Sequence, residues 1–182
     1  MYEKDALRAA MKEKAKLYVD RDFLEEDRRS CSALLESERY RRCNTLFAFH
    51  PLKGEVDITP LLEDALATRR LALPRTEDDG SLTFFAVTDL LRLKRGRFAI
   101  AEPDDGELMI PTSTDLMLIP ALAYDRSGRR LGRGKGYYDR YLKQYNSVCT
   151  VGVCRSYQLV ECIPTQEWDR TVDRVLCAGT LY

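Results

Sequence analysis

The sequence has very little histidine and no closely paired cysteines. Among 182 residues there is a single histidine, His50, and the six cysteines include no Cys-x-x-Cys pair. Zinc sites use such closely spaced ligands, so none is expected, and the cysteines are best explained as reduced structural thiols. Hydrolases with a Ser-His-Asp or Cys-His site need a histidine base, and no nucleophile-elbow pattern surrounds any serine. Both enzyme classes are therefore excluded.

The chain also lacks net charge and long apolar runs. Lysine plus arginine number 29 and aspartate plus glutamate number 29, so no overall field would attract nucleic acid or an anionic membrane. No apolar run approaches the roughly 20 residues that cross a bilayer. The charged amino terminus leaves no room for a secretory signal. We expect a soluble, cytoplasmic protein with one domain over residues 1–182, by default a monomer.

Two helices are expected at the start of the chain. Apolar residues at helical spacing predict an amphipathic helix from Lys4 to Tyr18 and a second from Asp20 to Arg42. The second would have an arginine-rich, solvated outer face. Nucleic-acid binding by that face is a weak alternative, because acidic residues are interspersed among the arginines. Its predicted inner side carries Phe23, Leu24, Cys31, Leu34 and Leu35.

Beyond residue 44, short apolar runs alternate with helical segments. Thr59 is the predicted N-cap of a helix with Pro60 at its first position, and another helix is expected from Tyr137 to Tyr145. This alternation predicts an α/β fold, a three-layer α/β/α sandwich with a largely parallel sheet. Ligands of such folds bind at the carboxyl ends of the strands. The expected strands cover 45–49, 70–74, 82–87, 115–119, 148–153 and 172–177.

The segment 132–136 is the first candidate binding site. Gly132, Gly134 and Gly136 remove side chains from alternate positions, so backbone N–H groups can converge on an anion. Arg133 and Lys135 add positive charge, and the following helix directs its N-terminal dipole to the same place. The spacing matches neither a Walker A loop nor a dinucleotide-binding fingerprint. A phosphate cradle and a flexible strand-to-helix connection both remain open.

Several residues near this segment or on the first helix each have two possible roles. Asp139, on the first turn of the helix, would either ligate magnesium or complement the helix dipole. Lys4 and Arg8 lie four positions apart on one helical face and would either grip a polyphosphate or face solvent. Tyr137 and Tyr138 would stack on a flat ring or anchor the helix to the core.

Taken together, these motifs resemble the 5-formyltetrahydrofolate cyclo-ligase family, also called methenyltetrahydrofolate synthetases. The resemblance runs from Lys4 to about Val175, and the glycine-tyrosine block is its most specific part. Two departures are alanines, Ala99 and Ala121, at positions where family members often have glycine. The matching pieces are Lys4-Asp5-Ala6-Leu7-Arg8, Gly54-Glu55-Val56-Asp57, Leu73-Pro74-Arg75, Ala101-Glu102-Pro103, Leu118-Ile119-Pro120 with Asp125, Arg130-Leu131-Gly132-Arg133-Gly134-Lys135-Gly136-Tyr137-Tyr138-Asp139-Arg140, and Ile163-Pro164 with Asp169 and Asp173.

The resemblance implies a fold similar to the sugar-phosphate isomerase and CoA-transferase group. It also implies conversion of 5-formyltetrahydrofolate to 5,10-methenyltetrahydrofolate with ATP and Mg²⁺, releasing ADP and phosphate. Asp139 would bind the metal, with Asp173 as a second ligand. His50, Glu55 and residues 133–137 would receive the folate. ATP would be held by Lys4, Asp5, Ala6, Leu7 and Arg8 and by Arg130, Leu131, Gly132, Arg133, Gly134, Lys135, Gly136, Tyr137 and Tyr138.

The chemistry of the reaction gives three of these residues a catalytic role. A formamide is a poor electrophile, so we expect a phosphorylated formyl intermediate, with Lys135, Arg133 and Lys4 offsetting charge during phosphoryl transfer. Two alternatives stay open at this point. One is a family paralogue with another role in cofactor metabolism, or with a binding role only. The other is a sugar-phosphate isomerase on a similar fold, which would need no ATP.

Overall fold

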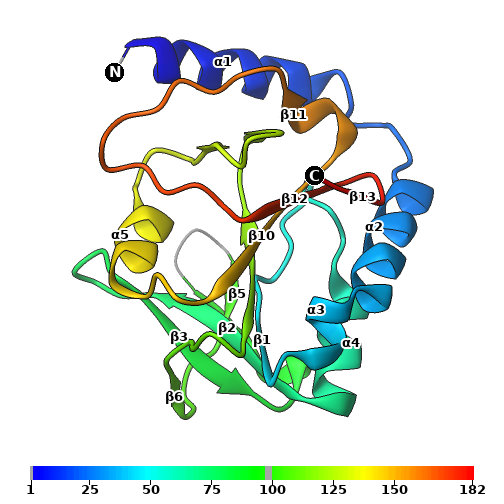
Figure 1. Cartoon of the computed structure of the whole chain (residues 1–182), viewed down its shortest axis with the longest axis vertical. Coiled ribbons are helices and arrows are strands. Elements are labelled where there is room, and N and C mark those ends of the chain that lie inside the picture. Colours follow the sequence, from blue (N-terminus) through cyan, green and yellow to red (C-terminus); the bar gives the residue numbers. More distant parts are fainter. Residues whose placement is uncertain (1, 97–99) are drawn as a thin grey trace.

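The computed structural model describes residues 2–96 and 100–182 (Figure 1). Its helices are α1 (Tyr2–Lys16), α2 (Leu24–Glu36), α3 (Glu38–Arg42), α4 (Thr59–Thr68) and α5 (Tyr137–Gln144), with 3₁₀ turns η1 (Leu90–Arg92) and η3 (Ser156–Gln158). Its strands are β1 (Thr45–Phe47), β2 (Arg70–Thr76), β3 (Leu82–Val87), β4 (Lys94–Arg95), β5 (Ala101–Glu102), β6 (Leu108–Met109), β7 (Leu116–Pro120), β8 (Ala123–Asp125), β9 (Arg130–Leu131), β10 (Cys149–Cys154), β11 (Leu159–Val160), β12 (Arg174–Cys177) and β13 (Thr180–Leu181).

One large sheet forms the centre of the described structure. Its eight strands run in the order β13-β12-β10-β7-β1-β2-β3-β6. The inner strands β12, β10, β7, β1 and β2 pair in parallel. The outer strands β13, β3 and β6 pair antiparallel with their neighbours. Helices α2, α3 and α4 cover one face and α5 lies on the other (Figure 1). The predicted α/β class with a largely parallel sheet is confirmed.

Adjacent residues of the inner strands are buried on opposite faces of the sheet. Leu46 packs with the side chains of α2 and α4, whereas Phe47 packs with those of α5. Leu118 and Ile119 divide between the two faces in the same way. Parallel strands covered on both faces need apolar side chains at successive positions. This requirement accounts for the continuous apolar run of β7.

Helix α1 lies across one end of the sheet and is attached there by a separate apolar cluster. Met11 of α1 is 4% exposed and packs against a small sheet in which β8 pairs with β11 and β9. Acidic residues in its first turn and lysines in its last turn complement the helix dipole. The helix therefore docks beside the connection that leads from β7 into the glycine segment.

The expected second helix, from Asp20 to Arg42, is wrong in its extent. It begins at Leu24 and is interrupted at Ser37, where the backbone is extended. The Ser37 hydroxyl donates to the Leu34 carbonyl at 2.7 Å and accepts from the Tyr40 N–H at 3.2 Å, replacing helical hydrogen bonds. The break lets Tyr40 turn inward, where it is 1% exposed. Leu24, assigned to the inner side, is 73% exposed.

The charge pattern of this helix predicted a solvated outer face, and this prediction is only partly correct. Glu26 and Asp27 are 7% and 8% exposed, because they meet cationic and backbone groups from distant segments. A smaller error concerns the next helix. The N-cap of α4 is Ile58 and not Thr59, and the Thr59 N–H donates to the Asp57 carboxylate at 3.0 Å.

Most other elements agree with expectation to within a few residues. The strand predicted over 82–87 coincides with β3, and α5 ends one residue before the predicted position. The two-residue strands such as β5, β6 and β9 were not expected, since segments so short carry no periodicity. In the described residues, no helix has the length and apolar character needed to cross a membrane.

Gly152, in the middle of β10, offers a test of the core. A Cβ at this position would lie 2.3 Å from Cε1 of Tyr124, whose side chain is completely buried. We expect Gly152→Ala to lower the free energy of unfolding by about 1–3 kcal/mol, because the ring has no free space to move into. Thermal or urea unfolding measures this change.

Gly132→Ala is the control for that measurement. A Cβ there meets nothing within 4 Å. Equal unfolding midpoints for the two variants would contradict the packing described for β10.

Candidate functional site

A cavity of about 400 Å³ opens where the parallel strands β1, β2 and β7 end. His50 follows β1, Thr76 closes β2 and Pro120 closes β7, and all three line the cavity. This is the edge at which an α/β sheet exposes its connecting loops to a ligand. The remaining lining residues are Phe49, Leu52, Glu55, Pro74, Leu82, Ile100, Glu102, Arg130, Gly132, Arg133, Lys135, Gly136, Tyr137, Tyr138 and Asp139.

The glycine segment forms one wall of this cavity. Gly134 and Gly136 have φ angles of 101° and 66°, in the left-handed region that disfavours side chains. Gly136 is the residue before α5, so the chain turns directly from the cavity wall into the helix. The first turn of α5 carries backbone N–H groups without intrahelical partners, which suits an anion. Lys135 is exposed and, within the described residues, makes no ion pair.

Asp139 is held in the cavity wall by a buried arginine. An Nη2 atom of Arg130 lies 2.5 Å from Oδ1 of Asp139, and the Arg170 N–H donates to the same oxygen at 3.2 Å. The Arg130 side chain is 3% exposed, and its Nε has no hydrogen-bond partner in the described part of the chain. Burial raises the pKa of the neighbouring Tyr138 above its ordinary value, so this hydroxyl stays protonated.

Glu55 comes from a different loop of the cavity and contacts the glycine segment. Its Oε1 lies 2.8 Å from Nη2 of Arg133, and its Oε2 accepts from the Leu52 N–H at 3.0 Å. The carboxylate side chain is 10% exposed, whereas that of Arg133 is 56% exposed. His50 lines the same space. The fold thus brings the residues expected to receive folate next to those expected to receive phosphate.

Helix α1 meets the glycine segment through Arg8. Its Nε donates to the Gly132 carbonyl at 3.0 Å, and its Nη1 lies 2.6 Å from Asp5. The ammonium group of Lys4 is paired with the largely buried carboxylate of Asp169, and Lys4 is not among the residues that line the cavity, so its expected role at ATP stays a prediction. Ala6 is exposed, while Leu7 and Leu131 pack in the apolar cluster under α1, which leaves only their backbones for a ligand.

The two carboxylates expected to share a metal line different cavities. Asp173 borders a second hollow of about 470 Å³ near the start of β10, where its Oδ2 accepts from the Thr150 N–H at 2.7 Å and from its hydroxyl at 2.8 Å. Asp169 is engaged by Lys4. In residues 2–96 and 100–182, no group of three or more histidine, cysteine or acidic side chains is arranged to hold a metal.

Comparison with known proteins identifies the family. The model of the 5-formyltetrahydrofolate cyclo-ligase family matches residues 1–178. The chain belongs to this family. The 5-formyltetrahydrofolate cyclo-ligase of Escherichia coli K12 is 36% identical over 146 residues, 76% of this chain and 80% of that protein. The cyclo-ligase of Mus musculus is 26% identical over 187 residues, covering 95% and 92% of the two chains.

A solved structure agrees with this assignment. The 5,10-methenyltetrahydrofolate synthetase of Aquifex aeolicus superimposes with a TM-score of 0.84 at 32% identity, over 98% of this chain and 91% of that one. The cyclo-ligase family membership makes the chain an enzyme of the ligase type, and the family's names place it in folate metabolism. The expected likeness to sugar-phosphate isomerases and CoA-transferases stays a prediction.

Of the two alanines that depart from the family pattern, the one in the described residues leaves the site intact. Ala121 is buried and has a negative φ, so its methyl group is accommodated without strain. Ala99 lies outside the described residues.

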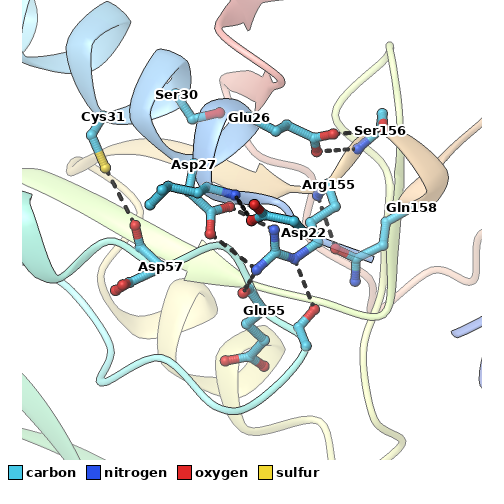
Figure 2. Close-up of polar contacts among 12 residues, drawn as sticks. Asp22, Glu26, Asp27, Ser30, Cys31, Glu55, Asp57, Arg155, Ser156 and Gln158 are labelled. Carbon is cyan, nitrogen blue, oxygen red and sulfur yellow. Dashed lines mark hydrogen bonds and ion pairs between the residues drawn. The ribbon is translucent and has the colours of Figure 1, made fainter. Parts of the chain in front are cut away.

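One feature of the chain had no recognisable sequence signal. Figure 2 shows Arg155, after β10, joining Asp27 of α2 to the loop that carries Glu55. Asp27 lies in a run of charges typical of an exposed helix, and Arg155 belongs to no motif. Only the buried contact between them indicates a role.

The Lys4–Asp169 contact offers a test of how α1 is held. The Lys4 and Asp169 side chains are 8% and 14% exposed. We expect Lys4→Met to destabilise the protein by about 3 kcal/mol, because Asp169 would be left buried without its cation. Chemical denaturation measures this, and proteolysis within α1 should become faster.

Lys16→Met serves as the matched control on the same helix, since Lys16 pairs with Glu13 but both side chains are 70% exposed. Its cost should stay below about 0.5 kcal/mol. If both variants are equally stable, the buried pair does not anchor α1.

Proposed function

We propose that this chain converts 5-formyltetrahydrofolate to 5,10-methenyltetrahydrofolate, using ATP and Mg²⁺ and releasing ADP and phosphate. The observation that carries the proposal is the single cavity shared by the glycine segment, Asp139 and Glu55. Because the chain belongs to the cyclo-ligase family, we assign the reaction named for that family to this cavity.

The two sides of the cavity differ in the way this reaction requires. One side has Arg133, Lys135 and the N-terminus of α5, which suit a polyphosphate. Outside the glycine segment and α5, the cavity is lined by apolar and aromatic groups such as Phe49, Leu52 and Leu82, which suit a flat ring system. Glu55 and His50 supply polar contacts there. Because Arg133 contacts Glu55, we infer that it lies between the two substrates.

Magnesium fits the donor set of this cavity when it arrives with a nucleotide. Mg²⁺ is commonly bound by one or two carboxylates together with substrate phosphates and water. Asp139 supplies one carboxylate at the wall, and Arg130, which is paired with it and also lines the cavity, would supply a positive charge near the phosphates. The metal would help to offset charge on the transferring phosphoryl group. Asp173 as a second ligand stays a prediction.

The proposed chemistry overcomes the poor reactivity of a formamide. The formyl oxygen attacks the γ-phosphorus of ATP, a new P–O bond forms, and the bond to ADP breaks. The second folate nitrogen then adds to the activated carbon and loses its proton, and the C–O bond breaks as phosphate leaves. The chain's own residues align the substrates and stabilise charge: Lys135 and Arg133 at the phosphates, Glu55 at the folate.

The proposal predicts an ATP-dependent product with a distinctive absorbance. Purified protein mixed with 5-formyltetrahydrofolate, Mg²⁺ and ATP should show a rise in near-ultraviolet absorbance from the methenyl compound. Leaving out ATP is the control and should abolish the rise. No rise with ATP present would refute the proposed reaction, and turnover of a sugar phosphate without ATP would favour an isomerase.

Two substitutions test the assigned roles in the cavity. We expect Lys135→Ala and Asp139→Ala each to lower kcat/KM by about 100-fold or more, since each removes a positioned charge near the transferring group. Circular dichroism should show that both variants are folded, although Asp139→Ala leaves the buried Arg130 without its carboxylate and should lower the unfolding midpoint. Lys143→Ala, on the exposed last turn of α5, is the control and should keep its activity. Near-normal turnover by either test variant would refute that residue's role.

We place the protein in the cytoplasm as a monomer that binds neither nucleic acid nor membrane. Lys4 keeps its predicted contribution to ATP binding only if ATP draws it away from Asp169.

A further inference from the structure

Arg155 is a buried cation that does not line the cavity but contacts the loop that does. The residue is 6% exposed and follows directly after β10. Its guanidinium group makes a two-pronged contact with Asp27, with Nη1···Oδ1 at 2.6 Å and Nη2···Oδ2 at 3.1 Å. The Cζ atom of Arg155 lies over the Phe23 ring, 4.1 Å from the ring centre. A planar cation placed in this way is fixed in orientation.

The other donors of Arg155 point at the backbone of the Glu55 loop. Its Nη2 donates to the carbonyl of Glu55 itself (Figure 2). Its Nε donates to the Gly54 carbonyl at 3.3 Å. Gly54 has a φ of 92°, a backbone conformation that glycine adopts readily and that residues with side chains disfavour. One guanidinium therefore joins α2 to the two residues that aim the Glu55 carboxylate.

The same residue is also connected to the chain that follows β7. Its backbone N–H donates to Gln158 Oε1 at 2.9 Å, and Gln158 Nε2 donates to the carbonyls of Ala121 and Leu122, both at 3.2 Å. These two residues begin the connection from β7 toward the glycine segment. Arg155 thus contacts the loop on the folate side and, through Gln158, the chain leading to the phosphate side.

We propose that Arg155 is a positioning residue for folate binding, which acts through the Gly54 and Glu55 carbonyls to aim the Glu55 carboxylate into the cavity. The inference rests on the proposed function for its substrate. Its structural part, that Arg155 orders the Glu55 loop, stands on the contacts alone. Lysine cannot replace arginine here, because a single ammonium group cannot span Asp27 and two carbonyls in one plane.

Arg155→Lys is the main test, since it keeps the charge and loses the fork. We expect its KM for 5-formyltetrahydrofolate to rise roughly 10-fold or more while its KM for ATP changes little. Arg69→Lys is the matched control. Arg69 is also mostly buried, lies over the Tyr40 ring and donates to the Tyr40 carbonyl, but does not line the cavity. Both KM values should be unchanged in the control.

A double-mutant cycle separates positioning from general destabilisation. If Arg155 acts through Glu55, Arg155→Lys should add little to the effect of Glu55→Gln on the KM for folate. Additive effects, or an equal rise of both KM values, would overturn the proposal. Asp27→Asn keeps Arg155 and weakens its orientation, so it should shift the folate KM in the same direction. This second variant decides the question if Arg155→Lys does not fold.

Amide hydrogen exchange tests the structural part without any substrate. The Leu52 N–H donates to Glu55 Oε2 at 3.0 Å and the Glu55 N–H donates to the Leu52 carbonyl at 2.9 Å. Both amides should exchange faster in Arg155→Lys than in Arg69→Lys or the parent protein. Unchanged exchange would overturn the positioning role. A parent protein that forms no methenyl product but shows this difference would instead overturn only the proposed reaction.

Discussion

The contact between Arg155 and Asp27 is the interaction on which the geometry of the cavity depends (Figure 2). Burial raises the pKa of Asp27, and the arginine opposes that effect by favouring the charged carboxylate. Such a pair adds little net stability in many proteins, since both charges lose their hydration. Here the pair matters because it fixes the orientation of the Arg155 guanidinium group. Each unsatisfied donor of a buried guanidinium would be costly, so the surrounding carbonyls must take up positions that satisfy it.

The rest of the site is arranged around that constraint by the parallel sheet. Strands β1, β2 and β7 end at one edge, so the loops after them face one cavity although they are far apart in sequence. The glycine segment enters the same space because β8 and β9 lead the chain back from β7 toward α5. The contact of Arg133 with Glu55 then joins the two sides. In the proposed reaction this contact lies where phosphate and formyl group must meet.

Local patterns allowed much of the fold to be predicted. The apolar run of β7 and the alternation of strands and helices indicate a parallel sheet, because strands buried on both faces favour apolar residues at successive positions. The errors have a common cause. A serine at position 37 is compatible with a helix or a break, and the inward packing of Tyr40 decides between them. In the sequence, Glu26 and Asp27 have the pattern of a solvated helix face. In the structure they are buried by contacts with residues 156 and 155.

By itself, the sequence determined the fold class, the glycine segment that needs left-handed backbone, and the family to which the motifs belong. Each of these depends on residues close together in the chain or on motifs kept in order. Only the tertiary structure decided that Asp139 and Asp173 line separate cavities, that Lys4 is engaged by Asp169, and that Arg155 supports Glu55. Those outcomes depend on which buried charges meet across long sequence separations. The residues next to a charged side chain in the sequence do not indicate which distant group will compensate its charge when it is buried.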